Sequence, residues 1–101
     1  MRILWPDEAL SDLEEILVYY HQEASPRSAA AVERRIIAEI ESLPPFVERI
    51  RKSDRVPGAH EQVVNKLPYG VFVQIRNDAI VVLNVVHTKR QFPNERRLSP
   101  D

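Results

Sequence analysis

The residues best suited to chemistry lie together at the end of an apolar run, in Val85-Val86-His87-Thr88-Lys89-Arg90. Histidine is the residue most used for proton transfer near neutral pH, and neighbouring cations can hold an anion such as a phosphate. The same residues also suit a structural role, because charges at a strand end discourage edge-to-edge aggregation. The sequence leaves both roles open for this segment.

Other motifs for catalysis or ligand binding are missing from the sequence. His21, His60 and His87 do not have the spacing of a metal site, and the chain has no cysteine to assist them. Two glycines, Gly58 and Gly70, are too few for a phosphate-binding loop, and no G-x-S-x-G motif is present. We therefore expect neither a metal nor another cofactor.

Length and composition indicate one globular domain over residues 1–101. An apolar share of 44% and a charged share of 29% are typical of a folded protein with a single modest core. The longest apolar stretch, residues 79–86, is too short to span a bilayer, and the first residues lack the apolar run of a secretory signal. Together with the absence of cysteine, this favours a cytoplasmic protein without a membrane partner.

Charge is divided between the two halves of the chain. Residues 1–46 carry four basic and nine acidic side chains, a net charge of −5, whereas residues 47–101 carry ten basic and six acidic ones, a net charge of +4. The basic half suits an acidic or polyanionic partner. The total of −1 argues against a dedicated nucleic-acid binder, which usually has a strongly basic domain.

Two amphipathic helices are predicted after a short strand at residues 2–5. Pro6 suits the first position of a helix that runs to about Glu23, and Ser25 can cap a second helix that starts at Pro26 and ends before Pro44-Pro45. Their apolar stripes are Ala9, Leu13, Ile16, Leu17 and Tyr20 in the first helix, and Ala29, Val32, Ile36, Ile40 and Leu43 in the second. The short break between them predicts an antiparallel helical hairpin.

A long loop and a β-hairpin follow. Residues 46–60 read as irregular, with a helical turn around 47–50, and strand periodicity begins at Glu61. The strands 69–76 and 79–87 are joined by the turn residues Asn77-Asp78, and residues 88–101 read as an edge segment or loose end. Both strands are apolar on two faces, which is typical of central strands covered by helices on at least one side.

The expected fold is therefore α+β, with an N-terminal helical hairpin packed on one face of a small, mainly antiparallel β-sheet. Its predicted core consists of Leu13, Ile16, Leu17, Ile36, Ile40, Val71, Val73, Val82 and Val85.

The order of these elements and three local phrases resemble the RelE/ParE toxins of bacterial type II toxin–antitoxin systems. The phrases are Ala9-Leu10-Ser11-Asp12-Leu13, then Leu67-Pro68-Tyr69-Gly70-Val71-Phe72-Val73, and finally the segment 82–90. The resemblance covers nearly the whole chain. It implies a cognate antitoxin as partner and one of two mechanisms.

The RelE-like branch cleaves messenger RNA in the ribosome, whereas the ParE-like branch poisons DNA gyrase and carries no known chemistry. In this chain the position of the family motif G-x-R-E is occupied by Gly58-Ala59-His60-Glu61, and that of Y-R-V by Tyr69-Gly70-Val71. Two family arginines are thus missing, and no tyrosine follows Tyr69, whereas His87 and Arg90 match the final H-x-x-R. Phosphodiester cleavage needs cations at the phosphate, so the missing arginines favour the ParE-like branch. Membership of that branch implies a protein without catalytic residues and a role in plasmid stabilisation.

Two sets of site residues follow from this resemblance. For a gyrase inhibitor, the target-binding surface is expected to comprise Arg49, Arg51, Lys52, His87, Lys89 and Arg90. For a ribosome-dependent endoribonuclease, an acid–base set of His60, Glu61, Arg76 and His87 is expected instead. A third alternative is an inactive relative that only binds its antitoxin. In each case the antitoxin is expected to cross the helical hairpin and a sheet edge, with acidic residues facing the basic half.

Overall fold

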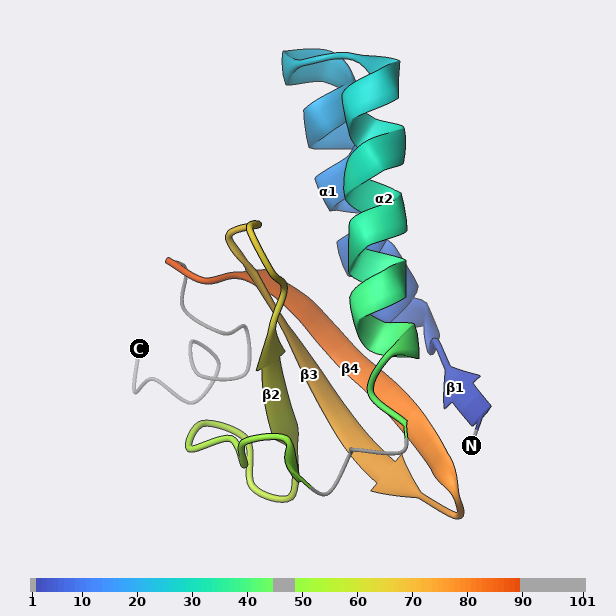
Figure 1. Cartoon of the computed structure of the whole chain (residues 1–101), viewed down its shortest axis with the longest axis vertical. Coiled ribbons are helices and arrows are strands. Elements are labelled where there is room, and N and C mark those ends of the chain that lie inside the picture. Colours follow the sequence, from blue (N-terminus) through green and yellow to red (C-terminus); the bar gives the residue numbers. More distant parts are fainter. Residues whose placement is uncertain (1, 45–48, 90–101) are drawn as a thin grey trace.

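A computed structural model describes residues 2–44 and 49–89. Strand β1 (Arg2–Leu4) precedes two helices, α1 (Asp7–Glu23) and α2 (Pro26–Glu41), and three strands follow: β2 (His60–Val63), β3 (Tyr69–Arg76) and β4 (Ala79–His87). The strands form one sheet in the order β1-β4-β3-β2, beside the helical hairpin (Figure 1). The predicted α+β fold with a mainly antiparallel sheet is confirmed.

The helices begin and end close to the predicted positions. The Ser25 hydroxyl accepts a hydrogen bond from the Ser28 N–H at 3.0 Å, which caps α2 as the sequence predicts. Helix α2 ends at Glu41, so Leu43 lies beyond the helix although its side chain still packs in the core. The Ser42 hydroxyl donates to the Glu39 carbonyl at 2.7 Å, and the proline at position 44 disfavours helical geometry in the residue before it.

Three of the four strands pair antiparallel, and β1 is the exception. β3 and β4 have the predicted bounds, and the turn residues Asn77 and Asp78 have φ values of 47° and 62°, as this kind of tight hairpin requires. β1 pairs in parallel with the first residues of β4, from Arg2 opposite Ala79 to Leu4 opposite Val81. Among residues 2–44 and 49–89, no strand pairs with this edge of β4 beyond Val81.

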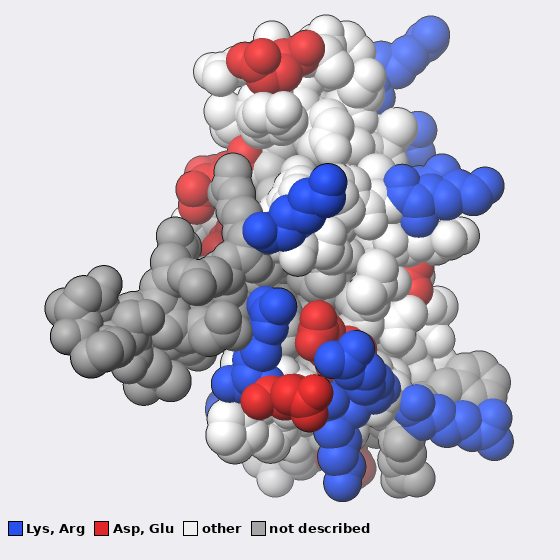
Figure 2. Space-filling model, turned by 90° about the vertical axis from the view of Figure 1, so that its left-hand side faces the viewer, with Lys and Arg blue, Asp and Glu red and all other residues white. Residues whose placement is uncertain are grey.

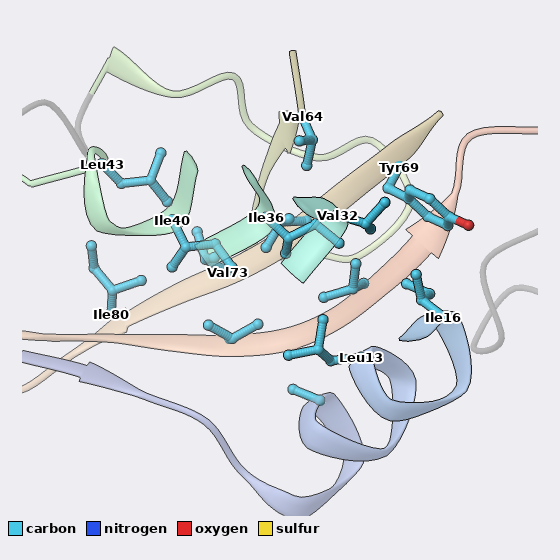
Figure 3. Packing of buried hydrophobic residues seen from close by; sticks show 14 of the residues in the cluster. Leu13, Ile16, Val32, Ile36, Ile40, Leu43, Val64, Tyr69, Val73 and Ile80 are labelled. Atoms are coloured by element: carbon cyan, nitrogen blue, oxygen red, sulfur yellow. The ribbon is translucent and has the colours of Figure 1, made fainter. Parts of the chain in front are cut away.

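The main core lies between the helical hairpin and the sheet (Figure 3). Eight of the nine predicted core residues are buried, and Leu17 lies half-buried against the core. The opposite face of the sheet, which we call the outer face, has its own small cluster of Phe72 and Val86 with Val56 and Leu83. Val56 belongs to the segment 49–59, so a loop packs on the outer face. The sequence had shown that both central strands are apolar on two faces, but not what covers the second of them.

Some predictions fall outside the described residues. These are residues 47 and 48 of the predicted helical turn at 47–50, and residues 90–101 of the predicted tail. Within residues 2–44 and 49–89, neither helix is long and apolar enough to cross a membrane.

Candidate functional site

The end of β4 is held by an aromatic cluster. The His87 ring packs edge-on against Tyr69 at a centroid distance of 5.5 Å, and Tyr69 packs in turn against Tyr20 of α1 at 6.4 Å. The Lys89 N–H donates a hydrogen bond to Nδ1 of His87 at 3.1 Å. Nδ1 therefore acts as acceptor, and Nε2 is the ring nitrogen that remains to contact a partner. This cluster was not predicted, because its three rings come from segments that are distant in the sequence.

The predicted cations of the loop lie beside β2. Arg49, Arg51 and Lys52 are exposed, and Lys52 forms an isolated antiparallel bridge with His60 at the start of β2. The Arg51 guanidinium lies 3.8 Å from the Asp54 carboxylate and 4.0 Å from that of Glu61. Figure 2 shows Lys and Arg side chains gathered with a few acidic ones in the lower part of this side of the molecule. From residue 49 to residue 66 the chain carries five basic and two acidic residues.

The loop cations and the end of β4 do not form one compact cluster. Lys52 lies opposite His60, which lies opposite Val73 of β3, whereas His87 lies opposite Tyr69 at the other end of the pairing. Standard strand spacings then place Lys52 and His87 about 20 Å apart between Cα atoms. A partner that contacts both must therefore be of protein or nucleic-acid size. The last residue of the predicted target-binding surface, Arg90, lies outside the described residues.

The four residues of the alternative acid–base set are dispersed over the sheet. Arg76 and His87 are opposite ends of the β3–β4 hairpin, about 23 Å apart at strand spacing. Nδ1 of His60 lies 3.0 Å from the Ile50 carbonyl, so it carries a proton and holds the loop to β2. Glu61 extends over Gly70 on the outer face, whereas His60 is on the face of the helices. These residues do not converge on a common reacting atom.

A polar cluster joins α1 to the unpaired edge of β4. Asn84 is buried within the sheet, and its Nδ2 donates to Oε2 of Glu8 at 3.0 Å and to Oδ2 of Asp12 at 2.9 Å. The same oxygen of Asp12 accepts from the Val85 N–H at 3.0 Å. A carboxylate from α1 thus occupies the position that a neighbouring strand would otherwise take. The polar Asn84 within an apolar run was the available sequence signal, but its partners are more than seventy residues away.

Burial raises the pKa of Asp12 above its usual value, and the hydrogen bonds from Asn84 and Val85 oppose that rise. The nearby carboxylates of Glu8 and Glu15 raise it further. A carboxyl group with a raised pKa binds a proton more readily in the folded than in the unfolded protein. Its contribution to the free energy of unfolding therefore increases as the pH falls from neutrality towards the ordinary aspartate value, and is lost again as the pH rises.

Asp12→Asn is expected to remove this pH dependence and to preserve the fold. One side-chain oxygen accepts both hydrogen bonds, so an asparagine oxygen can replace it without the half-buried charge. Asp12→Ala removes both acceptors and is expected to lower the free energy of unfolding by about 1–3 kcal/mol. Urea denaturation of the three proteins between pH 4 and pH 7.5 measures both effects. An Asp12→Asn protein with the pH slope of the wild type would contradict the assignment.

The surface of α1 combines exposed apolar residues with negative charge. Leu10 and Val18 are 47% and 48% exposed, and together with the half-buried Leu17 they follow the spacing i, i+7, i+8 along one side of the helix. The helix has six acidic residues and neither lysine nor arginine. Neighbouring exposed apolar side chains are a common feature of protein-binding surfaces. Among the described residues, no group of three or more His, Asp or Glu side chains is arranged to hold a metal ion.

Comparisons with known proteins agree with this architecture. The model of a family described as the ParE toxin of the type II toxin–antitoxin system parDE matches residues 3–92. A solved structure entitled "Chromosomal ParDE TA system from P. aeruginosa" has the same fold, with a TM-score of 0.80 and 21% sequence identity over 88% of this chain and 97% of that chain. No curated protein matches the chain.

The chain belongs to the family of ParE toxins of type II toxin–antitoxin systems, because the family model covers most of its length. The ParE-like branch expected from the sequence is therefore confirmed, and membership implies an antitoxin as partner.

Proposed function

We propose that this protein inhibits DNA gyrase and is neutralised by direct binding of its cognate antitoxin. The observation that carries the proposal is the dispersal of His60, Arg76 and His87 over the sheet in a member of the ParE family. Acid–base catalysis needs its groups within hydrogen-bond reach of one reacting bond. Widely spaced cations act instead by contacting a large partner.

The exposed cations fit the surface of such a target. Lys52 and Lys89 are exposed at two ends of the sheet, and no hydrogen bond or ion pair of their side chains occurs among the described residues. Long cationic side chains in this state are available to acidic groups of a partner, where they contribute to specificity and association rate. His87 contributes shape and a single donor at Nε2 on this proposal, and no proton transfer. A gyrase target requires the protein to act in the cytoplasm.

The antitoxin is proposed to bind both the acidic helix α1 and the basic chain that follows the helical hairpin. A segment with apolar and basic residues fits the stripe of Leu10, Leu17 and Val18 on α1, which is surrounded by carboxylates. A second, acidic segment fits the basic chain between residues 49 and 66. Such complementarity makes the association sensitive to salt. Antitoxin affinity that does not change with salt would contradict this electrostatic part.

A supercoiling assay tests the proposed function directly. The purified protein is added to DNA gyrase, relaxed plasmid and ATP, and we expect supercoiling to be inhibited and to recover when the antitoxin is added in stoichiometric amount. The matched control is the protein pre-mixed with antitoxin before gyrase is added. A parallel assay with ribosomes and messenger RNA is expected to show no cleavage.

The alternatives predict different results in these two assays. Messenger-RNA cleavage without an effect on gyrase would overturn the proposal in favour of the RelE-like nuclease. No effect in either assay, with antitoxin binding intact, would identify an inactive relative.

A further inference from the structure

A groove outside the proposed gyrase-binding and antitoxin-binding surfaces lies at the edge of β4 next to β1, and the polar pair of Glu8 and Asn84 forms part of its lining. It has a volume of about 450 Å³, within the range of ligand-binding sites, and is lined by Pro6, Glu8, Arg76 and the β4 residues from Val81 to Asn84. β1 pairs with β4 only as far as Val81, and the chain then turns into α1 at Pro6. The groove thus occupies the place where β1 would continue alongside β4.

The groove continues onto the outer face of the sheet. Side chains alternate along a strand, and Phe72 faces outwards, so Arg76 on the same strand also faces outwards. Register then places Arg2 and Arg76 on either side of Ala79, about 10 Å apart at inter-strand spacing. Both arginines are exposed, and neither forms an ion pair among the described residues. Two residues further along β1, on the same face, Leu4 lies opposite Val81, and 41% of its surface is exposed.

The side chains that line the groove favour a polypeptide as its ligand. A guanidinium binds a carboxylate through two parallel hydrogen bonds, so Arg76 suits an aspartate or glutamate side chain. Val81, Leu83 and Pro6 supply apolar walls, which suit an aliphatic side chain next to that carboxylate. Glu8 lies in the same groove and would repel a nucleic-acid backbone, whereas the N–H groups of a peptide can donate to it.

We propose that this groove binds an extended segment of the antitoxin in which an acidic residue is adjacent to an apolar one. The inference rests on the antitoxin part of the proposed function and adds a contact outside both the apolar stripe of α1 and the basic segment. It assigns Arg76, the one member of the alternative acid–base set at this end of the sheet, to partner binding.

Charge reversal at Arg76 tests the assignment. The affinity of the full-length antitoxin for Arg76→Glu is expected to fall at least tenfold relative to the wild type, measured by calorimetry at fixed salt. The matched control is Arg27→Glu, the same change in the first turn of α2, about 24 Å along the hairpin from the start of α1. Its affinity is expected to stay within twofold, and circular dichroism establishes that both variants are folded. Equal affinities of Arg76→Glu and the wild type would overturn the assignment.

A photo-cross-linking amino acid in place of Leu4 identifies the occupant. With antitoxin present, we expect a cross-link to an antitoxin peptide that contains Asp or Glu beside an apolar residue. A cross-link to gyrase, or to an antitoxin segment without an acidic residue, would overturn the proposal. Both measurements are independent of the supercoiling assay, so a failure of gyrase inhibition does not affect them.

Discussion

Truncation of Ile40 to alanine is expected to lower the free energy of unfolding by about 2–5 kcal/mol. Ile40 is 1% exposed in α2 and lies beside Val73 and Ile80 in the main core (Figure 3). The change removes three carbon atoms and leaves a cavity between the helical hairpin and the sheet. Domains of this size have total stabilities of about 5–15 kcal/mol, so the loss is a large fraction of the whole. Denaturation in guanidinium chloride measures it as a lower midpoint.

Ile37→Ala is the matched control for this prediction. It is the same truncation in the same helix, but Ile37 is only half-buried at the border of the core. Fewer atoms lose contacts there, and solvent can fill part of the space, so a clearly smaller loss is expected. An unchanged midpoint for Ile40→Ala, or equal losses for the two variants, would contradict the packing of α2 on the sheet.

Charge reversal on the proposed target surface is expected to have the largest effect on function. The double variant Lys52→Glu, Lys89→Glu should inhibit supercoiling at least tenfold less than the wild type, because two exposed cations become repulsive to acidic groups of the target. His87→Gln should keep its activity within about twofold, since glutamine retains a hydrogen-bond donor and gyrase inhibition needs no proton transfer. If His87 were a general acid or base, its loss would cost about 10²–10⁴-fold in rate.

The controls for these variants change the same residue types elsewhere. His21→Gln lies near the end of α1, and Arg27→Glu lies in the first turn of α2. Both are expected to inhibit supercoiling as the wild type does. A His87→Gln protein that is folded and binds antitoxin but has lost toxicity, together with messenger-RNA cleavage by the wild type, would establish a catalytic histidine and reject the gyrase proposal. Full activity of the Lys52, Lys89 double variant would remove these cations from the target surface.

Local features of the sequence were sufficient for the helices and the hairpin. Helical spacing of apolar residues, the Ser25-Pro26 start of α2 and the Asn77-Asp78 turn each act within a few residues, so they can be read without knowing the rest of the molecule. The sequence phrases shared with the RelE/ParE toxins predicted the ParE-like branch, and the family comparison confirmed that prediction. The predicted target-binding residues remain a prediction.

The tertiary structure alone decided where β1 pairs and which side chains from distant segments meet. A three-residue strand has no periodicity that identifies a partner, so only the assembled sheet places β1 in parallel beside β4 and ends their pairing at Val81. The bonds from Asn84 to Glu8 and Asp12, the ring contacts of His87 and the groove at Arg76 all depend on that arrangement. Contacts between residues distant in the sequence form because burial of the whole core favours one packing, and this global free energy is not contained in any local pattern.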